Sequence, residues 1–143
     1  MLELQDVETY YGSIQALFGM SFRAEQGQVT TLIGRNGMGK TTTVGSIIGT
    51  VPRRRGEITF MGKRIDGQPA YKVAQCGIGL VPEGRQIFPN LTVRENMLAT
   101  AANRLKVETP YTLERILTIF PRLTERLGHY GNQLSGGEQQ MLA

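Results

Sequence analysis

The chain has 143 residues, of which 40% are apolar and 20% charged, with a formal net charge of +4; this predicts one globular domain with its own core. No apolar run is long enough to span a bilayer, the N-terminus does not resemble a signal peptide, and the single cysteine, Cys76, excludes an internal disulfide. The basic residues are scattered apart from a cluster at 53–55 in a predicted turn, so the charge does not indicate a nucleic-acid partner.

The first part of the chain is predicted to be rich in strands. Rough alternation of apolar residues predicts a strand over residues 2–11, and a second strand is predicted over 16–22 after a turn at Gly12. A turn near Gly27 then precedes a short apolar run, residues 29–33, which predicts a third strand. This third strand leads directly into a glycine-rich loop.

That loop, residues 34–42, is called the phosphate loop below. Its spacing is G-x-x-x-x-G-K-T, and it lies between a predicted strand and a predicted helix over residues 40–48. Its glycines allow backbone angles that a Cβ would forbid, so that backbone N–H groups can turn toward an anion. Lys40 brings a positive charge to the β- and γ-phosphates, and the Thr41 hydroxyl can bind Mg²⁺. We therefore predict a nucleoside triphosphate site here.

Further elements follow as far as residue 82. The pattern predicts a short strand over 56–62, a short helix over 69–75 that begins at a proline, and a buried strand over 78–81 that ends at Pro82. From Glu83 onward helical signals dominate. Thr92 and Glu95 have the spacing of a capping box and predict a helix towards residue 103.

The last predicted helices complete a helical part. Thr109 and Pro110 are typical of a helix start, and the apolar residues that follow lie on one face of a helix that ends near Pro121. We therefore predict a single domain over residues 1–143, divided into a strand-rich α/β part at 1–82 and a helical part at 83–143.

A second motif, Leu-Ser-Gly-Gly-Glu-Gln-Gln over residues 134–140, is called the signature segment below. Ser135 and Glu138 have capping-box spacing, so Ser135 is predicted to cap a helix that begins near Gly136. Because Gly136 and Gly137 carry no side chains, the first N–H groups of that helix are open to an outside anion. The segment is predicted to be a second phosphate-binding end.

The phosphate loop and the signature segment together resemble the ATP-binding cassette (ABC) family of ATPases. The resemblance implies an α/β fold: a P-loop NTPase core with an antiparallel β subdomain and a helical subdomain. It implies Mg²⁺ and ATP as cofactors, with ATP bound in cis by Gly34, Asn36, Gly37, Gly39, Lys40, Thr41 and Thr42. Two such domains pack head to tail in that family, which implies that Ser135, Gly136 and Gly137 contact the γ-phosphate in trans. It also implies that Tyr11, the aromatic residue at the end of the first strand, stacks on adenine.

Residues 81–96 match the family's hinge between its core and its helical subdomain. That hinge usually starts with a glutamine whose side chain senses Mg²⁺ and the attacking water, and the matching position here is Glu83. A carboxylate can bind Mg²⁺ but adds negative charge beside the phosphates. We carry the catalytic and metal role over to Glu83 as an expectation, together with the catalytic role of Lys40 and the metal role of Thr41.

The amino-acid sequence of the hinge is similar to that of one subgroup, the ATP-binding subunits of branched-chain amino acid importers. The run Val-Pro-Glu-Gly-Arg over residues 81–85, the segment 10–17 and the last six residues carry this similarity. It implies a second ATPase subunit, an integral membrane permease and, indirectly, a periplasmic solute-binding protein as partners, with no nucleic acid. It places the chain peripherally on the cytoplasmic face of the inner membrane.

The resemblance assigns permease contact to the region around residues 86–98. Its apolar residues either form that contact patch or bury inside the helical part, and the sequence leaves both open; they are Ile87, Phe88, Leu91 and Met97. The family's aspartate–glutamate strand and switch histidine would follow the signature segment, whereas this sequence ends at Ala143 and its one histidine, His129, precedes the segment. We therefore expect the parent subunit to hydrolyse ATP, and these residues alone to bind ATP with little turnover.

Two other functions use parts of the same pattern. A soluble cassette protein that acts on DNA or the ribosome without a permease usually carries large insertions or a fused second cassette, and this sequence shows neither. A small-molecule kinase or GTPase would use the phosphate loop but leaves the signature segment unexplained. Transport through a membrane permease accounts for more of the sequence than either alternative.

Overall fold

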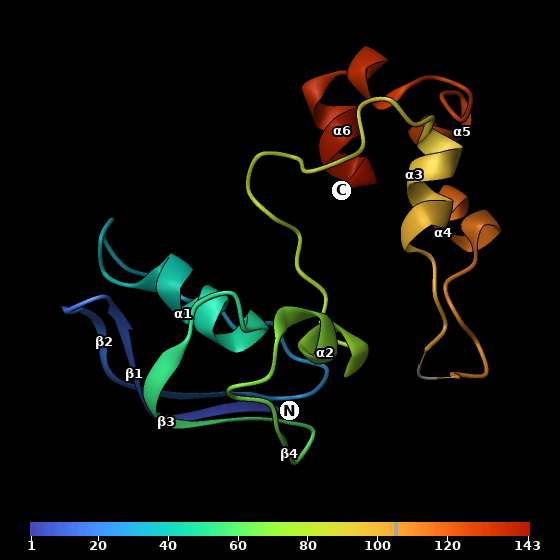
Figure 1. Cartoon of the computed structure of the whole chain (residues 1–143). Coiled ribbons are helices and arrows are strands. Elements are labelled where there is room, and N and C mark those ends of the chain that lie inside the picture. Colours follow the sequence, from blue (N-terminus) through green and yellow to red (C-terminus); the bar gives the residue numbers. More distant parts are fainter. Residues whose placement is uncertain (105) are drawn as a thin grey trace. The chain divides into compact units, whose positions relative to one another are not determined.

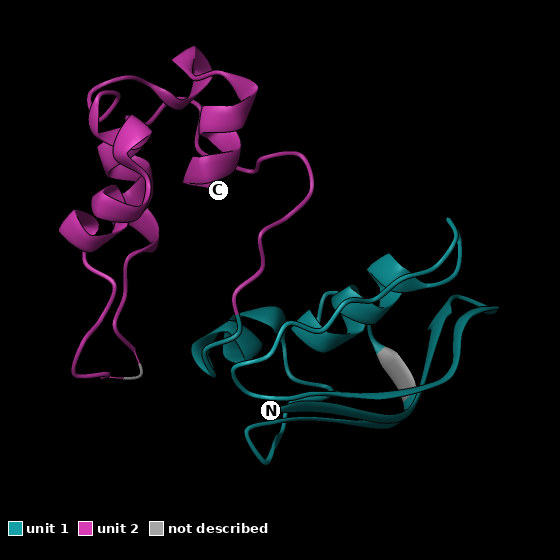
Figure 2. Ribbon diagram, turned by 180° about the vertical axis from the view of Figure 1, so that it is seen from behind, with its two compact units in different colours: residues 1–78 teal, residues 79–143 magenta. Residues whose placement is uncertain are grey.

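The computed structural model describes residues 1–104 and 106–143, without the side chains of Arg53 and Arg54. The chain divides into two compact units, unit 1 over Met1–Ile78 and unit 2 over Gly79–Ala143 (Figure 2). The boundary predicted from the sequence lies close by, after residue 82. Among the described residues, no helix has both the length and the apolar character that a membrane crossing requires.

Unit 1 is built on a four-stranded antiparallel sheet (Figure 1). Its strands lie in the order β2-β1-β3-β4, and their bounds are Leu2–Tyr11 for β1, Ile14–Ala24 for β2, Arg53–Phe60 for β3 and Lys63–Arg64 for β4. The central strand β1 pairs with β2 on one side and β3 on the other, so that Leu4 lies opposite both Phe22 and Ile58. The predicted antiparallel β part of the fold is confirmed.

The pairing with β1 also corrects the predicted start of β3. The cluster at 53–55 was expected in a turn before a strand that begins at Gly56. Instead Glu8 pairs with Arg55 and Thr9 pairs with Arg53, so β3 begins at Arg53. Because β1 is long, it also provides backbone hydrogen-bonding partners for the residues that precede Gly56. A strand extends as far as its neighbour can pair with it.

Two predicted strands, residues 29–33 and 78–81, are not strands in the structure. Their apolar side chains are largely exposed: Val29 is 96% exposed and Ile33 86%. A strand is stabilised by backbone hydrogen bonds to a neighbour, and neither segment has a strand partner among the described residues. Apolar character alone therefore predicted strands that the pairing does not provide.

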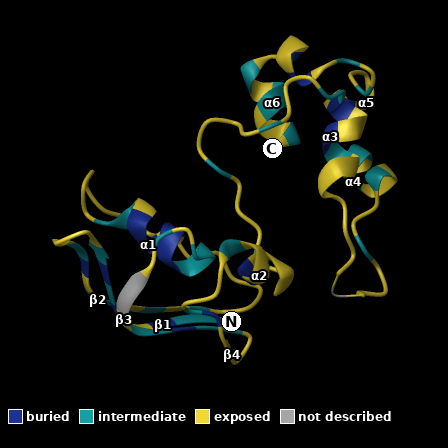
Figure 3. Ribbon diagram, in the orientation of Figure 1, coloured by how far each residue is buried: buried dark blue, intermediate teal, exposed yellow. Residues whose placement is uncertain are grey.

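Two helices, α1 (Lys40–Ile48) and α2 (Ala70–Gln75), accompany the sheet in unit 1. A buried hydrogen bond of 2.9 Å between the hydroxyls of Thr9 and Ser46 attaches α1 to β1. The apolar core is formed by buried residues of the strands, α2 and a connecting loop (Figure 3), namely Leu4, Val7, Leu17, Ile58, Ile65 and Val73. The hydrogen bond at Ser46 holds the second half of α1, the helix that follows the phosphate loop, against the sheet.

Unit 2 is helical, as predicted. Its elements are α3 (Val93–Thr100), α4 (Leu113–Ile119), α5 (Pro121–Thr124), the 3₁₀ helix η1 (Gly131–Gln133) and α6 (Gly136–Leu142). They pack around the buried side chains of Val93, Leu123 and Leu134. The predicted capping box is confirmed, because Thr92 Oγ1 accepts the Glu95 N–H at 3.2 Å and Glu95 Oε2 accepts the Thr92 N–H at 2.8 Å.

The predicted start of α4 is wrong. The sequence favoured Thr109 and Pro110, whereas Thr112 caps the helix and its Oγ1 accepts the Arg115 N–H at 3.3 Å. The apolar face of the helix begins only at Leu113, so the capping residue is Thr112, which directly precedes it. Likewise α3 ends at Thr100 rather than near residue 103.

Candidate nucleotide site

The phosphate loop turns sharply at two glycines before α1 begins. Gly37 and Gly39 have φ angles of 83° and 82°, in the left-handed region where a side chain is strained. A Cβ on Gly39 would in addition lie 2.7 Å from Leu17 Cδ2 and 3.1 Å from the Ala16 carbonyl oxygen. Gly39 therefore combines a left-handed turn with close packing against β2, and only glycine satisfies both.

The ammonium group of Lys40 closes this loop into a ring. Lys40 Nζ donates to the carbonyl oxygen of Gly34 at 2.6 Å and to that of Arg35 at 2.9 Å, and the Met38 N–H donates to the same Arg35 carbonyl at 3.3 Å. These bonds bring the start and the end of the loop together around one positive charge. The first N–H groups of α1 have no acceptor within the helix because of their position in it. A fixed cation beside free amide donors is the donor set that a phosphate requires.

The threonines that follow Lys40 differ in their surroundings. Thr41, the predicted Mg²⁺ ligand, is exposed, whereas Thr42 is buried. The Thr42 hydroxyl lies 3.4 Å from the hydroxyl of Tyr11, whose side chain is 51% exposed at the end of β1. The structure thus brings Tyr11, the predicted adenine contact, to the start of α1, with half of its surface open to a ligand.

A hollow next to the phosphate loop was not predicted from the sequence. It has a volume of about 410 Å³, and its lining comes from β2 and the loop: Ala16, Leu17, Phe18, Gly19, Met20, Ser21 and Met38. No sequence signal pointed to it, because it depends on Met38 folding back over a strand that lies twenty residues earlier in the chain. Asn36, another predicted nucleotide ligand, lies in the same loop and is exposed.

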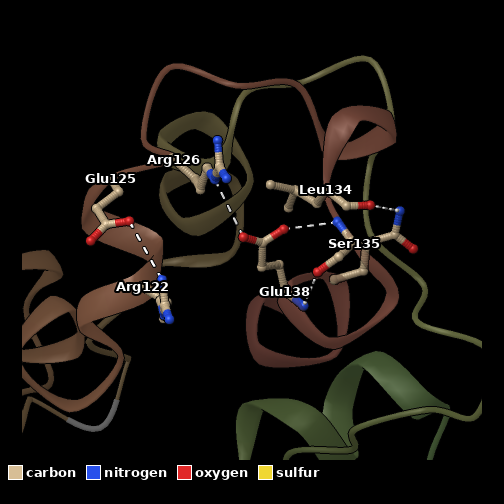
Figure 4. A network of polar contacts seen from close by, with 7 residues as sticks. Arg122, Glu125, Arg126, Leu134, Ser135 and Glu138 are labelled. Carbon is tan, nitrogen blue, oxygen red and sulfur yellow. Dashed lines mark hydrogen bonds and ion pairs between the residues drawn. The ribbon is translucent and has the colours of Figure 1, made fainter.

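The signature segment forms the cap that its spacing predicted. Ser135 Oγ accepts the Glu138 N–H at 3.3 Å, and Glu138 Oε2 accepts the Ser135 N–H at 2.8 Å (Figure 4). Gln139 Nε2 donates to the carbonyl oxygens of Gly131 and Leu134, which fixes the chain that leads into α6. Gly137 is exposed and has no atom within 4 Å of the place of a Cβ, so its backbone is open on that side.

Gly136 is covered by a residue that the sequence analysis did not select. The guanidinium of Arg85 lies over it, with Arg85 Nη1 2.7 Å from the place of a Gly136 Cβ. These two residues are 51 positions apart in the chain, and no local pattern connects them.

Glu83 is exposed in unit 2, at the start of the hinge loop (residues 83–90), whereas Thr41 belongs to unit 1. Among the described residues, no group of three or more acidic, histidine or cysteine side chains is arranged to hold a metal ion. A Mg²⁺ ion here would therefore need oxygen ligands from a nucleotide and water in addition to the Thr41 hydroxyl. The metal role of Thr41 and the metal and catalytic roles of Glu83 stay predictions.

The apolar residues of the predicted permease region have different surroundings. Met97 packs against the core of unit 2, while Phe88 is 51% exposed. Asn96 directly precedes Met97 in the chain, and it is buried. Its side chain holds the hinge loop, because it accepts the Phe88 N–H and donates to the carbonyl oxygens of Phe88, Leu91 and Thr92. Phe88 is therefore the large apolar residue of this loop that is exposed.

The electrostatics of the signature segment centre on Glu138. Its pKa is lowered below the ordinary value of 4.5, first by the hydrogen bond from the Ser135 backbone N–H, then by the Ser135 side chain and by Arg126. Arg126 Nε lies 3.3 Å from Glu138 Oε1 and links α6 to the segment after α5 (Figure 4).

This lowered pKa predicts a pH dependence of stability. A carboxylate whose pKa is depressed in the folded state stabilises the fold above its ordinary pKa, and the effect is lost as the pH falls through the folded value. We expect the urea midpoint of the chain to fall between about pH 5 and pH 3, and to fall less steeply in Glu138→Gln, which has no proton to take up. Equal slopes for the two proteins in this range would contradict the prediction.

Comparisons with known proteins agree on one family. A family model described as ABC transporter matches residues 17–143. The chain is 40% identical over 143 residues to the high-affinity branched-chain amino acid transport ATP-binding protein of Pseudomonas aeruginosa, and 30% identical over 146 residues to the glutamate/aspartate import ATP-binding protein of Escherichia coli. In both cases all of this chain matches 61% of the relative.

Solved structures give the same result. One described as the ATP-binding subunit of an ABC transporter superposes with a TM-score of 0.84 at 31% identity, covering 99% of this chain and 59% of that one. A dimeric bacterial ABC transporter cassette superposes with a TM-score of 0.76 at 25% identity, covering 99% of this chain and 66% of that one. The chain thus spans about three-fifths of the length of the relatives it matches.

Proposed function

The chain belongs to the ABC transporter family, and from this premise we propose that it binds ATP at the phosphate loop as part of a subunit that powers solute import. The observation that carries the proposal is the closure of the phosphate loop around the Lys40 ammonium group. This group makes two hydrogen bonds to loop carbonyls, and the backbone is left-handed at Gly37 and Gly39. A triphosphate takes a fixed cation and several backbone donors at once, and this loop offers them together.

Each predicted ligand has a proposed role that fits its position. Lys40 holds the β- and γ-phosphates, the Thr41 hydroxyl binds Mg²⁺, and the ring of Tyr11 stacks on the adenine. In the parent subunit, Ser135, Gly136 and Gly137 contact the γ-phosphate of ATP held by a second ATPase subunit. ATP then supplies the energy, and the protein supplies a binding surface whose two halves close on it.

The proposed solute is a branched-chain amino acid. The 40% identity to the Pseudomonas aeruginosa protein supports this, together with 32% identity to a probable branched-chain amino acid transport ATP-binding protein of Archaeoglobus fulgidus. The proposal includes a membrane permease as partner and a place on the cytoplasmic face of the membrane, with a solute-binding protein acting outside. The half-exposed Phe88 is our candidate for the permease contact.

A binding experiment with two ligands tests the nucleotide site. We expect Tyr11→Ala to weaken the binding of ATP about tenfold or more, because stacking of a base on an aromatic ring contributes about 1–3 kcal/mol, and to leave the binding of inorganic tripolyphosphate unchanged. Calorimetric titration of both ligands checks this, with the exposed Tyr71→Ala as the matched control. Equal weakening of both ligands, or of neither, would contradict the assignment of Tyr11 to the base.

A further inference from the structure

The hinge loop contains a sharp turn at two consecutive residues. Gly84 has a φ of 82° and Arg85 a φ of 52°, so both lie in the left-handed region. For a residue with a side chain this conformation is strained, because the Cβ approaches the following carbonyl oxygen. The Ile87 N–H donates to the Arg85 carbonyl oxygen at 2.7 Å and holds the turn closed. Such strain persists where the surrounding structure requires it, and it points to a function for the residue that bears it.

The strained residue carries its side chain onto the signature segment. Three guanidinium atoms of Arg85, Nη1, Cζ and Nη2, lie 2.7, 3.0 and 3.3 Å from the place that a Cβ on Gly136 would occupy. The guanidinium therefore covers the backbone of Gly136, and no side chain fits between them. A side chain at position 136 would meet the end of the Arg85 side chain, which would have to move aside.

The same loop approaches the chain before the signature segment in a second place. A Cβ on Gly131 would lie 2.8 Å from the Phe88 carbonyl oxygen and 3.2 Å from Pro89 Cα. The Gly131 N–H donates to the Leu91 carbonyl oxygen at 2.9 Å, and the Asn132 N–H donates to that of Pro89 at 3.1 Å. The hinge loop is thus docked on the backbone of residues 131–136 at both ends, and Arg85 makes the contact nearest to the signature glycines.

Arg85 is an exposed residue whose guanidinium lies against Gly136. In the part of the chain that the structure describes, its guanidinium has no recorded hydrogen bond or ion pair. The carboxylate of Glu138, in the same first turn of α6, is engaged by the Ser135 N–H and by Arg126. The contact of Arg85 with the signature segment on which the inference rests is therefore the one at Gly136.

We propose that Arg85 is a positioning residue, which packs over Gly136 and fixes the first turn of α6 so that the signature segment presents its glycines to ATP held by a second subunit. The inference rests on the proposed function, in which residues 135–137 contact the γ-phosphate. It couples the hinge loop, which starts at Glu83, to the signature segment through one side chain. A side chain at position 136 would compete with Arg85 for the same space.

Two measurements on the same set of variants test this role: Arg85→Ala, Arg85→Lys, Gly136→Ala and the double variant Arg85→Ala/Gly136→Ala. The first is the amide resonances of Gly136 and Gly137 in the ¹⁵N-labelled chain without nucleotide. The second is ATP-dependent self-association by sedimentation. We expect Arg85→Ala to shift both resonances and to weaken the association about tenfold, with ATP binding at the phosphate loop and the urea midpoint unchanged.

The other variants separate positioning from a general loss of structure. Gly136→Ala should reproduce the effect of Arg85→Ala, and the double variant should add little to either, because residues in direct contact are not additive. Arg85→Lys keeps the charge but lacks the flat guanidinium, so it should not restore the association. Unshifted resonances in Arg85→Ala, full rescue by lysine, or additive effects in the double variant would overturn the proposal.

Failure of the proposed function gives a different result. If the unmodified chain does not associate with ATP, or if Lys40→Ala associates as well as the unmodified chain, the trans contact is wrong, and the resonances of Gly136 and Gly137 still decide whether Arg85 fixes the turn. If Lys40→Ala loses the association while Arg85→Ala keeps it, only the role of Arg85 is wrong.

Discussion

Lys40→Ala is expected to weaken the binding of ATP about 100-fold. A hydrogen bond to a charged group contributes about 1.5–3 kcal/mol, and Lys40 is the cation around which the phosphate loop closes. Removing it takes away the charge that we propose faces the phosphates and also the two bonds that tie Lys40 to the carbonyls of Gly34 and Arg35. Titration with a fluorescent ATP analogue measures the loss.

The design includes a matched control and a second ligand. Lys63→Ala removes an exposed lysine of β4 and changes the net charge equally, so its affinity for ATP should stay within about twofold of that of the unmodified chain. Tripolyphosphate should lose as much affinity as ATP in Lys40→Ala, because the lost contact is to phosphate. Binding of ATP to Lys40→Ala within about threefold of the unmodified chain would show that the loop is not a phosphate site.

Asn96→Asp is expected to lower the free energy of unfolding of unit 2 by about 2 kcal/mol or more, because Asn96 is buried and the loss of a hydrogen-bonding partner at a buried site costs about 1–3 kcal/mol, and more where a charge is introduced. The Asn96 amide donates to three carbonyl oxygens, those of Phe88, Leu91 and Thr92, at 3.0–3.1 Å. A carboxylate has the same shape but no N–H groups, and it places a negative charge against the three carbonyl oxygens. The hinge loop would lose its anchor on α3.

Urea unfolding at pH 7 measures this loss, with Asn132→Asp as the control. Asn132 is exposed, and the same substitution there adds the same charge without removing a buried donor, so its effect should stay within about 0.5 kcal/mol. An unfolding free energy of Asn96→Asp within about 1 kcal/mol of the unmodified chain would contradict the role of Asn96 as the anchor of the hinge loop.

Local chemistry predicted the turns and caps of the candidate site. The phosphate loop was visible because the spacing of its glycines, its lysine and its threonine is set by the turn that the residues themselves must make. The caps at Thr92 and Ser135 were visible for the same reason, since each needs only a partner three residues later. The cap of α4 was misplaced by three residues because Thr109 and Thr112 both carry the required hydroxyl, and only the start of the apolar face distinguishes them.

Contacts between distant segments were not predictable in this way. The run 29–33 has the composition of a strand, but a strand forms only where a neighbouring strand pairs with its backbone. The composition of the run does not show whether such a neighbouring strand is present. Arg85 carries no signal of its contact with Gly136, because the left-handed turn that directs it is rare for arginine. The hollow beside Met38 likewise depends on how the loop folds over β2.

A mixing experiment tests most directly whether the phosphate loop and the signature segment of two copies bind the same ATP. Gly137→Glu puts a negative charge where the γ-phosphate would lie, at a position with open space around it, and Lys40→Ala removes the loop's cation. A composite site consists of the phosphate loop of one copy and the signature segment of the other. A dimer of either variant with itself has no intact composite site. A dimer of the two variants has one, because Gly137→Glu supplies an intact phosphate loop and Lys40→Ala an intact signature segment. Sedimentation with ATP should therefore show association of the unmodified chain and of the equimolar mixture, and none of either variant alone. A mixture that associates no better than its components, or variants that associate as well as the unmodified chain, would contradict the account.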